Sequence, residues 1–183
     1  MTTRIGVRLA LFATIVATIG CDRATKHMAA TTLAGTPMRS FLADTVRLEY
    51  AENPGGFLSL GARLRPAYRT GLFTIATGLT LLALVASAFR SRSRTWPLLG
   101  LSLFVAGGAS NWADRVVRGS VIDFMNIGFG PVRTGIFNVA DVAILVGAAM
   151  VVFYELRRGE DAERRGGSAS PPFRGFLRPT GGE

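Results

Sequence analysis

Four apolar segments, each near the length needed to cross a bilayer, constrain this chain more than any other feature. They lie at about 5–21, 71–89, 96–113 and 139–154. A spanning helix needs about 20 mostly apolar residues, because lipid offers no partner for an unpaired backbone group. The composition agrees, since 49% of the 183 residues are hydrophobic and the mean hydropathy is +0.33. We therefore expect an all-α integral membrane protein with four transmembrane helices.

Basic residues lie at the ends of these segments. The chain has 21 Lys and Arg against 12 Asp and Glu, a formal net charge of +9. Nucleic-acid-binding proteins gather such charge on one surface, whereas here Arg4 and Arg8 precede the first segment and arginines fill 90–94 between two others. Short arginine-rich loops stay in the cytoplasm. We expect no nucleic-acid partner, both termini in the cytoplasm, and loops 27–69 and 114–137 at the outer face.

The regions between and after the segments predict two smaller features and a tail. Residues 46–50 and 132–137 have strand patterns, which predict a small extracytoplasmic β cradle. Apolar side chains four apart within 61–68 predict a short surface helix. Residues 1–156 should form the membrane domain, and 157–183, with almost nothing to bury, a disordered cytoplasmic tail.

Cys21 has two interpretations. The first apolar segment ends in Thr18-Ile19-Gly20-Cys21, as a lipoprotein signal peptide ends at its modified cysteine. Three further apolar segments follow, however, which a simple lipoprotein would lack. As the single cysteine it forms no internal disulfide, and we expect it to be buried and inert.

Two aspartates lie where a membrane chain accommodates a carboxylate least readily. Asp123 stands among apolar neighbours, and Asp141 begins the fourth apolar segment. An ionisable residue in such a place is a functional hypothesis. Asp141 also has a structural interpretation, because Asn138 is a good N-cap and an acid three residues later complements the helix dipole. Asp123 has none and needs a partner or a proton, so the two together suggest acid–base chemistry on water.

Other polar residues suggest structural pairs. Asp22 and Lys26 are spaced i and i+4, which predicts an ion pair on a helix surface. Asp114 and Arg115 are adjacent at the end of the third apolar segment, where we expect them to pair. The residues show no spacing of His and Cys typical of a metal site. We therefore expect neither a metal nor another cofactor.

Five short motifs together resemble the lipoprotein signal peptidases, or signal peptidase II. In chain order they are Asp22-x-x-Thr25-Lys26, Glu52-Asn53-x-Gly55, Asn111-x-x-Asp114-Arg115, Val121-x-Asp123-Phe124 and Phe137-Asn138-x-Ala140-Asp141. Each motif alone is weak. All five occur in the order and approximate spacing of the family, and the resemblance covers about residues 4–154.

The resemblance implies a bacterial inner-membrane aspartic endopeptidase with its active site at the outer face. Such enzymes remove the signal peptide from diacylglyceryl-modified prolipoproteins, cutting just before the lipidated cysteine, and globomycin-type cyclic peptides inhibit them. It assigns Asp123 and Asp141 as the catalytic dyad. The motif residues implied to hold the substrate or shape the site are Asn53, Gly55, Asn111, Asp114, Arg115 and Asn138.

Two departures from the family pattern leave alternatives open. The stretch 53–57 is one residue shorter than usual, and Ser110 precedes Asn111 where Gly is common. The shortened loop changes the cover of the site, so an inactive relative that binds lipidated peptides without cutting is one alternative. A small proton-coupled membrane protein that uses the aspartates as a relay is another. Prolipoproteins and membrane lipids are the expected partners, and a monomer is the expected state.

Overall fold

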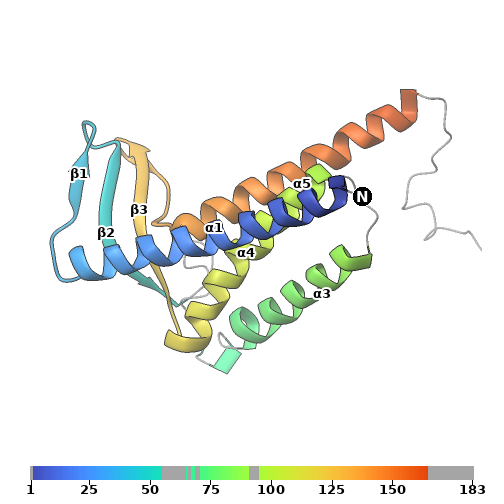
Figure 1. Cartoon of the computed structure of the whole chain (residues 1–183). Helices are drawn as coiled ribbons and strands as arrows, with labels where there is room; N and C mark the ends of the chain where they lie inside the picture. Colours follow the sequence, from blue (N-terminus) through green and yellow to red (C-terminus); the bar gives the residue numbers. More distant parts are fainter. Residues whose placement is uncertain (1, 55–64, 66, 69–70, 91–94, 165–183) are drawn as a thin grey trace, which may run out of the picture.

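The computed structural model describes residues 2–54, 65, 67–68, 71–90 and 95–164. A bundle of long helices carries a small antiparallel sheet at one end (Figure 1). The helical elements are α1 (Thr2–Thr32), the π-helix η2 (Gly71–Ala76), α3 (Thr77–Arg90), α4 (Thr95–Arg118) and α5 (Val139–Arg164). The strands are β1 (Arg39–Phe41), β2 (Val46–Asn53), β3 (Val121–Phe129) and β4 (Val132–Arg133).

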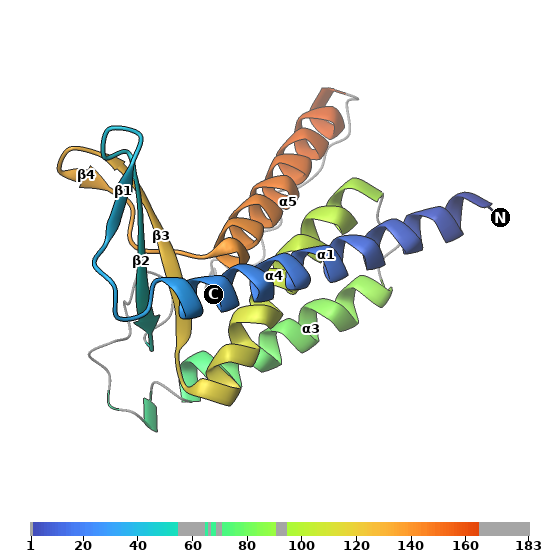
Figure 2. The same cartoon turned by 60° about the vertical axis from the view of Figure 1, so that its left-hand side comes forward.

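Three helical segments are long and apolar enough to cross a membrane. They are Ile5–Thr32, Gly71–Ala88 and Val139–Asp161, and few of the residues in each are buried within the protein. α4 lies at the centre, where it packs against α1, α3 and α5, while α3 lies beside α4 (Figure 2). The expected helical membrane fold with a small sheet is therefore confirmed. Crossing by α4 as a fourth span stays a prediction.

Several expected boundaries were wrong. α1 continues beyond Cys21 to Thr32, because the charges that follow Cys21 are paired inside the bundle rather than placed at its end. Cys21 itself is exposed, not buried. α5 continues to Arg164, so residues 157–164 are helical and not part of an unstructured tail. Residues 165–183, and nearly all of the expected surface helix at 61–68, lie outside the described residues.

Glycines bring α4 and α5 into close contact. A Cβ placed on Gly107 would clash with the carbonyl of Ala140, and one on Gly147 would clash with the carbonyl of Gly100. Helices gain little hydrophobic energy from leaving lipid, so small residues that let backbones approach determine their packing. The first contact fixes the middle of α4 against the first turn of α5, and the second fixes the early part of α4 against a later turn of α5.

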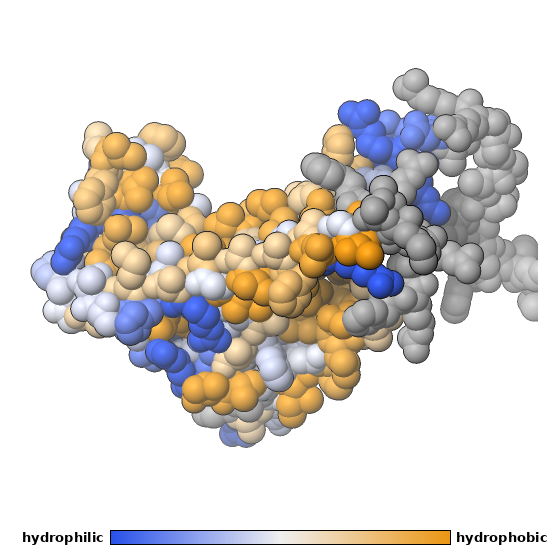
Figure 3. Space-filling view, viewed as in Figure 1, coloured by the Kyte–Doolittle hydropathy of each residue, from blue (hydrophilic) through white to orange (hydrophobic). Residues whose placement is uncertain are grey.

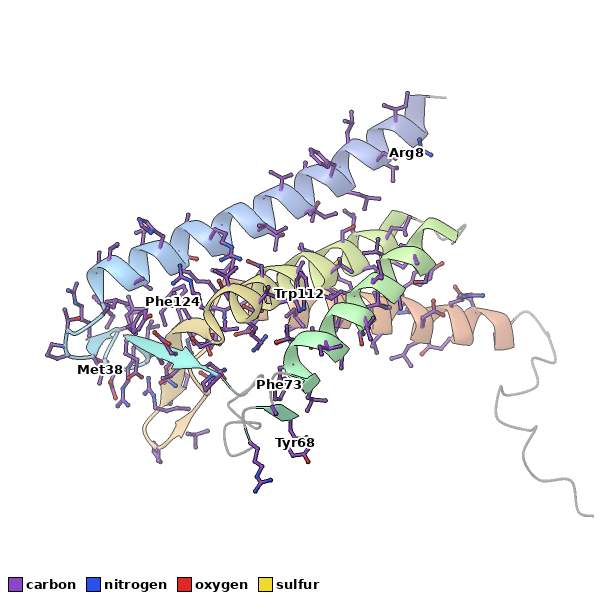
Figure 4. The ribbon with its side chains drawn as sticks, turned by 90° about the horizontal axis from the view of Figure 1, so that it is seen from below. Arg8, Met38, Tyr68, Phe73, Trp112 and Phe124 are labelled. Atoms are coloured by element: carbon purple, nitrogen blue, oxygen red, sulfur yellow. The ribbon has the colours of Figure 1, made fainter. Side chains whose placement is uncertain are left out.

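The sheet is antiparallel with strand order β1-β2-β3-β4. β2 confirms the strand expected at 46–50, whereas the strand expected at 132–137 is limited to β4, with Phe137 adding one bridge to Met125. β3 is held against α1 by a small apolar core, in which Phe124 is buried beside Leu33 (Figure 4). The sheet is thus fixed to the end of the bundle by its central strand.

The α4–α5 contact predicts a sharp difference between two glycines. Gly107→Ala should reduce the free energy of unfolding by roughly 1–3 kcal/mol, because the new methyl group overpacks a contact with backbone. Gly20→Ala is the matched control, since nothing lies within 4 Å of its Cβ position. It should change stability by less than about 1 kcal/mol. Thermal unfolding in detergent micelles measures both, and equal effects would contradict the packing argument.

Candidate active site

Asp123 lies on β3 with its carboxylate enclosed. The residue is 2% exposed. Its Oδ2 accepts a hydrogen bond of 2.8 Å from Asn53 Nδ2, at the end of β2, and its Oδ1 accepts one of 2.6 Å from Asn138 Nδ2. The two amides satisfy the partner requirement that its apolar sequence context imposes. Strand pairing and the start of α5 therefore both position this group.

Asp141 and Asn138 cap α5 reciprocally. The Asp141 N–H donates to Asn138 Oδ1 at 2.9 Å, and the Asn138 N–H donates to Asp141 Oδ2 at 3.1 Å. This pattern satisfies backbone donors that a helix start leaves unpaired, and it confirms the expected N-cap. The cap also fixes the direction of the Asp141 carboxylate.

Two asparagines join the aspartates into one network. Asn138 donates from its side chain to Asp123 and from its backbone to Asp141. Asn111 Nδ2 donates to Asp141 Oδ1 at 2.8 Å, and Asn111 Oδ1 accepts from Asn138 Nδ2 at 3.3 Å. The structure thus brings Asp123 and Asp141 to one site built from β2, β3, α4 and α5.

A buried charge cluster adjoins this network. Lys26 Nζ lies 2.7 Å from Asp22 Oδ2 and 2.8 Å from Asp114 Oδ2, and it donates to Asn111 Oδ1 at 2.7 Å. Arg23 Nη1 lies 2.5 Å from Asp114 Oδ1. The expected Asp22–Lys26 pair is confirmed, but it is buried rather than at a helix surface. The expected Asp114–Arg115 pair is wrong, because Asp114 faces α1 and pairs with its two cations.

Asp22 also holds the start of α5. Its Oδ1 accepts from the Ala140 N–H at 2.9 Å, and its Oδ2 accepts from Ser110 Oγ at 2.7 Å. Ser110, where the family commonly has Gly, therefore has a defined role in this chain. The sequence marked Ser110 only as a departure from the family pattern and did not mark Arg23, because both act through contacts between distant helices.

Arg115 and Trp112 face the π-helix rather than the charge cluster. Trp112 Nε1 donates to the Thr74 carbonyl at 2.7 Å, and the Arg115 guanidinium lies 5.9 Å from the centre of the Phe73 ring (Figure 4). Among the residues the structure describes, Arg115 Nε has no hydrogen-bond partner. This nitrogen is thus a buried donor that the contacts among the described residues leave unsatisfied. Gly55 lies outside the described residues.

The pKa of Asp123 is raised to about 6. Burial is the main cause, because it disfavours the charged form, and the negative charge of Asp141 acts in the same direction. Hydrogen bonds from Asn53 and Asn138 oppose the rise. A carboxyl group with such a pKa stays protonated at a higher pH than an ordinary aspartate does, so this site can donate and accept protons near neutral pH.

No group of three or more His, Cys, Asp or Glu that could hold a metal ion occurs in the part of the chain that the structure describes. The chemistry available from these residues is that of two carboxyl groups, three amides and nearby cations.

Comparisons with known proteins give one family. Residues 14–157 match the family model described as signal peptidase (SPase) II. A lipoprotein signal peptidase from Desulforapulum autotrophicum is 34% identical over 156 residues, which are 84% of this chain and 94% of the relative. One from Syntrophomonas wolfei is 32% identical over 143 residues, 78% and 90% of the two chains. A solved bacterial membrane enzyme matches with a TM-score of 0.72 and 25% identity, over 83% of this chain and 90% of that one.

The raised pKa of Asp123 predicts how stability changes with pH. Between pH 3.8, the ordinary pKa of an aspartate, and about pH 6, the folded state holds a proton that the unfolded state has lost. Stability therefore falls as pH rises through this window. Asp123→Asn removes this term, so the stability of the variant relative to the unchanged protein should increase from pH 4 to pH 7. Melting temperatures across that range measure it, and parallel curves would contradict the assignment.

The charge cluster predicts unequal roles for its two cations. Lys26→Met should reduce stability by about 3–5 kcal/mol, because it leaves buried carboxylates short of a partner. Arg23→Met is the matched control, since the Arg23 side chain is 41% exposed and Asp114 keeps Lys26. It should have a clearly smaller effect. Chemical denaturation in detergent compares them, and a larger loss in Arg23→Met would overturn the ranking.

Proposed function

Because this chain belongs to the signal peptidase II family, it is a membrane protease of lipoprotein processing, and we propose that Asp123 and Asp141 are its catalytic dyad. It would cut diacylglyceryl-modified prolipoproteins just before the lipidated cysteine. The observation that carries the proposal is the hydrogen-bond network in which Asn138 contacts both carboxylates.

The two carboxyl groups have different surroundings, which suggests different roles. Asp141 lies in the first turn of α5, where the helix dipole and the amide of Asn111 favour an anion. Asp123 is buried with a raised pKa and would hold the shared proton. Two close carboxyl groups of this kind titrate as a unit. Asp141 would therefore act as the base and Asp123 as the acid.

The proposed reaction needs only these groups and water. Asp141 takes a proton from a water molecule as the oxygen of that water attacks the scissile carbonyl carbon. Asp123 donates a hydrogen bond, and then its proton, to the carbonyl oxygen as the tetrahedral intermediate forms. As the carbon–nitrogen bond breaks, Asp141 gives the proton it took from water to the leaving nitrogen, which departs as an amine. Asp123 takes a proton back from a hydroxyl of the intermediate as the new carboxyl group forms.

The surrounding residues would hold the site and the substrate. Asn53 and Asn138 keep the Asp123 carboxyl in place, and Asn111 does so for Asp141. Asp22, Lys26 and Asp114 position the helices rather than contact the substrate. Arg115 and Gly55, as members of the family's motifs, would hold the substrate or shape the site.

The proposed orientation of the protein in the membrane follows from its substrate, which is anchored in the bilayer by lipid. The protein is a bacterial inner-membrane protein, and four spans, α4 included, would put both termini in the cytoplasm. The sheet and both aspartates lie at the same end of the bundle (Figure 1), which would then face outward. A diacylated cysteine anchored in that leaflet could reach the aspartates from the side.

Cleavage of a diacylglyceryl-modified prolipoprotein tests the proposal. Asp123→Asn and Asp141→Asn should each lower turnover by at least about 10²-fold, because each removes one partner of the proton transfer. Glu155→Gln is the matched control, since it neutralises an exposed carboxylate on α5. It should keep full activity. A chelator should also leave activity unchanged.

Two outcomes would replace the proposal. If the unchanged protein binds the lipidated substrate without cutting it, the chain is an inactive relative. If it cuts nothing but carries protons across proteoliposome membranes, and Asp123→Asn stops that flux, the aspartates form a relay. Full activity in either aspartate variant would remove that residue from the dyad.

A further inference from the structure

The end of the sheet away from Asn53 has an apolar face that the described residues leave largely uncovered. Strand register places Phe41 beside Val46, Val46 beside Ile127, and Phe129 beside Val132. Paired residues share a face and side chains alternate along each strand, so these lie together. The exposed fractions are 48% for Phe41, 41% for Ile127, 75% for Phe129 and 78% for Val132.

The opposite face of the same sheet end is polar and closed on itself. Arg133 Nε donates to Asn126 Oδ1 at 2.6 Å, and its Nη1 donates to the Asp44 carbonyl at 2.7 Å. Arg47 donates through two nitrogens to the Asp44 carboxylate, which also accepts from Ser40. Water can satisfy this face, so the two faces of the sheet end require different surroundings.

The turn that carries part of the apolar face is strained. Leu42, Ala43 and Asp44 have φ angles of 52°, 49° and 67°, a region that side-chain-bearing residues enter at a cost. The bonds to Asp44 hold this turn against β4, and they lower the pKa of its carboxyl, chiefly through the hydrogen bond from Arg47. Leu42 remains 76% exposed at the tip. Strain is thus retained in a turn that presents an apolar side chain outward.

The position of this face indicates what covers it. In both views the two sheet turns lie on the side of α5 and away from α3 (Figures 1 and 2). α5 exposes Val142, Leu145 and Val146 within its membrane-length segment. In the space-filling view apolar residues gather on the upper part of the sheet lobe, above hydrophilic ones, and on the helices beside it, and the surface is hollowed between the lobe and α5 (Figure 3).

We propose that the apolar face of the sheet end, formed by Phe41, Ile127, Phe129 and Val132, is a membrane contact that rests in the leaflet around the site end of the helices. The apolar surface of α5 beside it already requires lipid, so lipid continues naturally onto the sheet. Exposed Arg39 shares this face by register and can contact lipid phosphates.

The contact would support the sheet at a fixed height above the site. β3 carries Asp123 and Ile127 on the same face, because they are four residues apart in one strand. Lipid under the far half of β3 would therefore hold the near half, with Asp123, at the membrane surface. The inference goes beyond the proposed cleavage and does not depend on which carboxyl group carries the proton.

Environment-sensitive labels on the two faces test the contact. In a Cys21→Ala background, a nitrobenzoxadiazole fluorophore is attached to Phe129→Cys or Val132→Cys, and Ser40→Cys on the polar face is the matched control. The proteins are placed in nanodiscs of phosphatidylglycerol and phosphatidylethanolamine. Nitroxide-labelled lipids should quench positions 129 and 132 at least about threefold more than position 40, and aqueous iodide should show the reverse order.

Each other outcome overturns the proposal. Equal iodide quenching at positions 129 and 40 would show that water covers both faces. Protection that appears only with two protein copies in a nanodisc would assign the face to a second copy instead. Thermal unfolding of each labelled variant shows that the sheet is intact. If the labels unfold the protein, Phe129→Trp and Val132→Trp, read by brominated-lipid quenching of their added fluorescence, replace them.

Discussion

The architecture depends on one buried ammonium group. Lys26 lies between Asp22 and Asp114 and also donates to Asn111, with 3% of its side chain exposed. A buried charge is tolerated only when paired and hydrogen-bonded, so this one requirement fixes α1 to α4. Through Asp22 and the Ala140 N–H it also fixes the start of α5. The same ammonium orients Asn111, because an amide oxygen facing a cation leaves its nitrogen to face Asp141. The ion pairs that hold the helices together and the hydrogen bonds that orient the site residues therefore form one network.

Patterns of neighbouring residues in the sequence predicted those features that depend on neighbouring residues alone. The apolar segments gave the helices, alternation gave β2, and the residue types at 138 and 141 gave the helix cap. Partners across helices were not predictable, because spacing along the chain does not encode them. Asp114 was expected to pair with its neighbour Arg115, yet it pairs with two cations on α1. The end of α1 was placed too early for the same reason. The charges of Asp22 and Lys26 suggested that the helix ends at the membrane surface, but they pair inside the bundle and α1 continues to Thr32.

The candidate site followed the same division. That two aspartates in apolar contexts need partners could be inferred from the sequence, and the structure supplies amides for both. That Asn138 serves two carboxylates could not be inferred, because it requires β3 to approach α5. Antiparallel pairing of β2 with β3 and the contact of Phe124 with α1 produce that approach. The fold thus brings together groups whose need for a hydrogen-bond partner could already be inferred from the sequence.

The asymmetry between the two carboxyl groups follows from where each element ends. Asp141 stands at a helix start, where the backbone supplies donors that favour an anion. Asp123 stands within a strand, whose backbone groups are occupied by the sheet, so only side-chain amides reach it and burial dominates its pKa. A pair made from one helix start and one strand interior therefore gives its two carboxyl groups different hydrogen-bond donors. Such a pair suits a membrane surface, where any added unpaired charge would be costly.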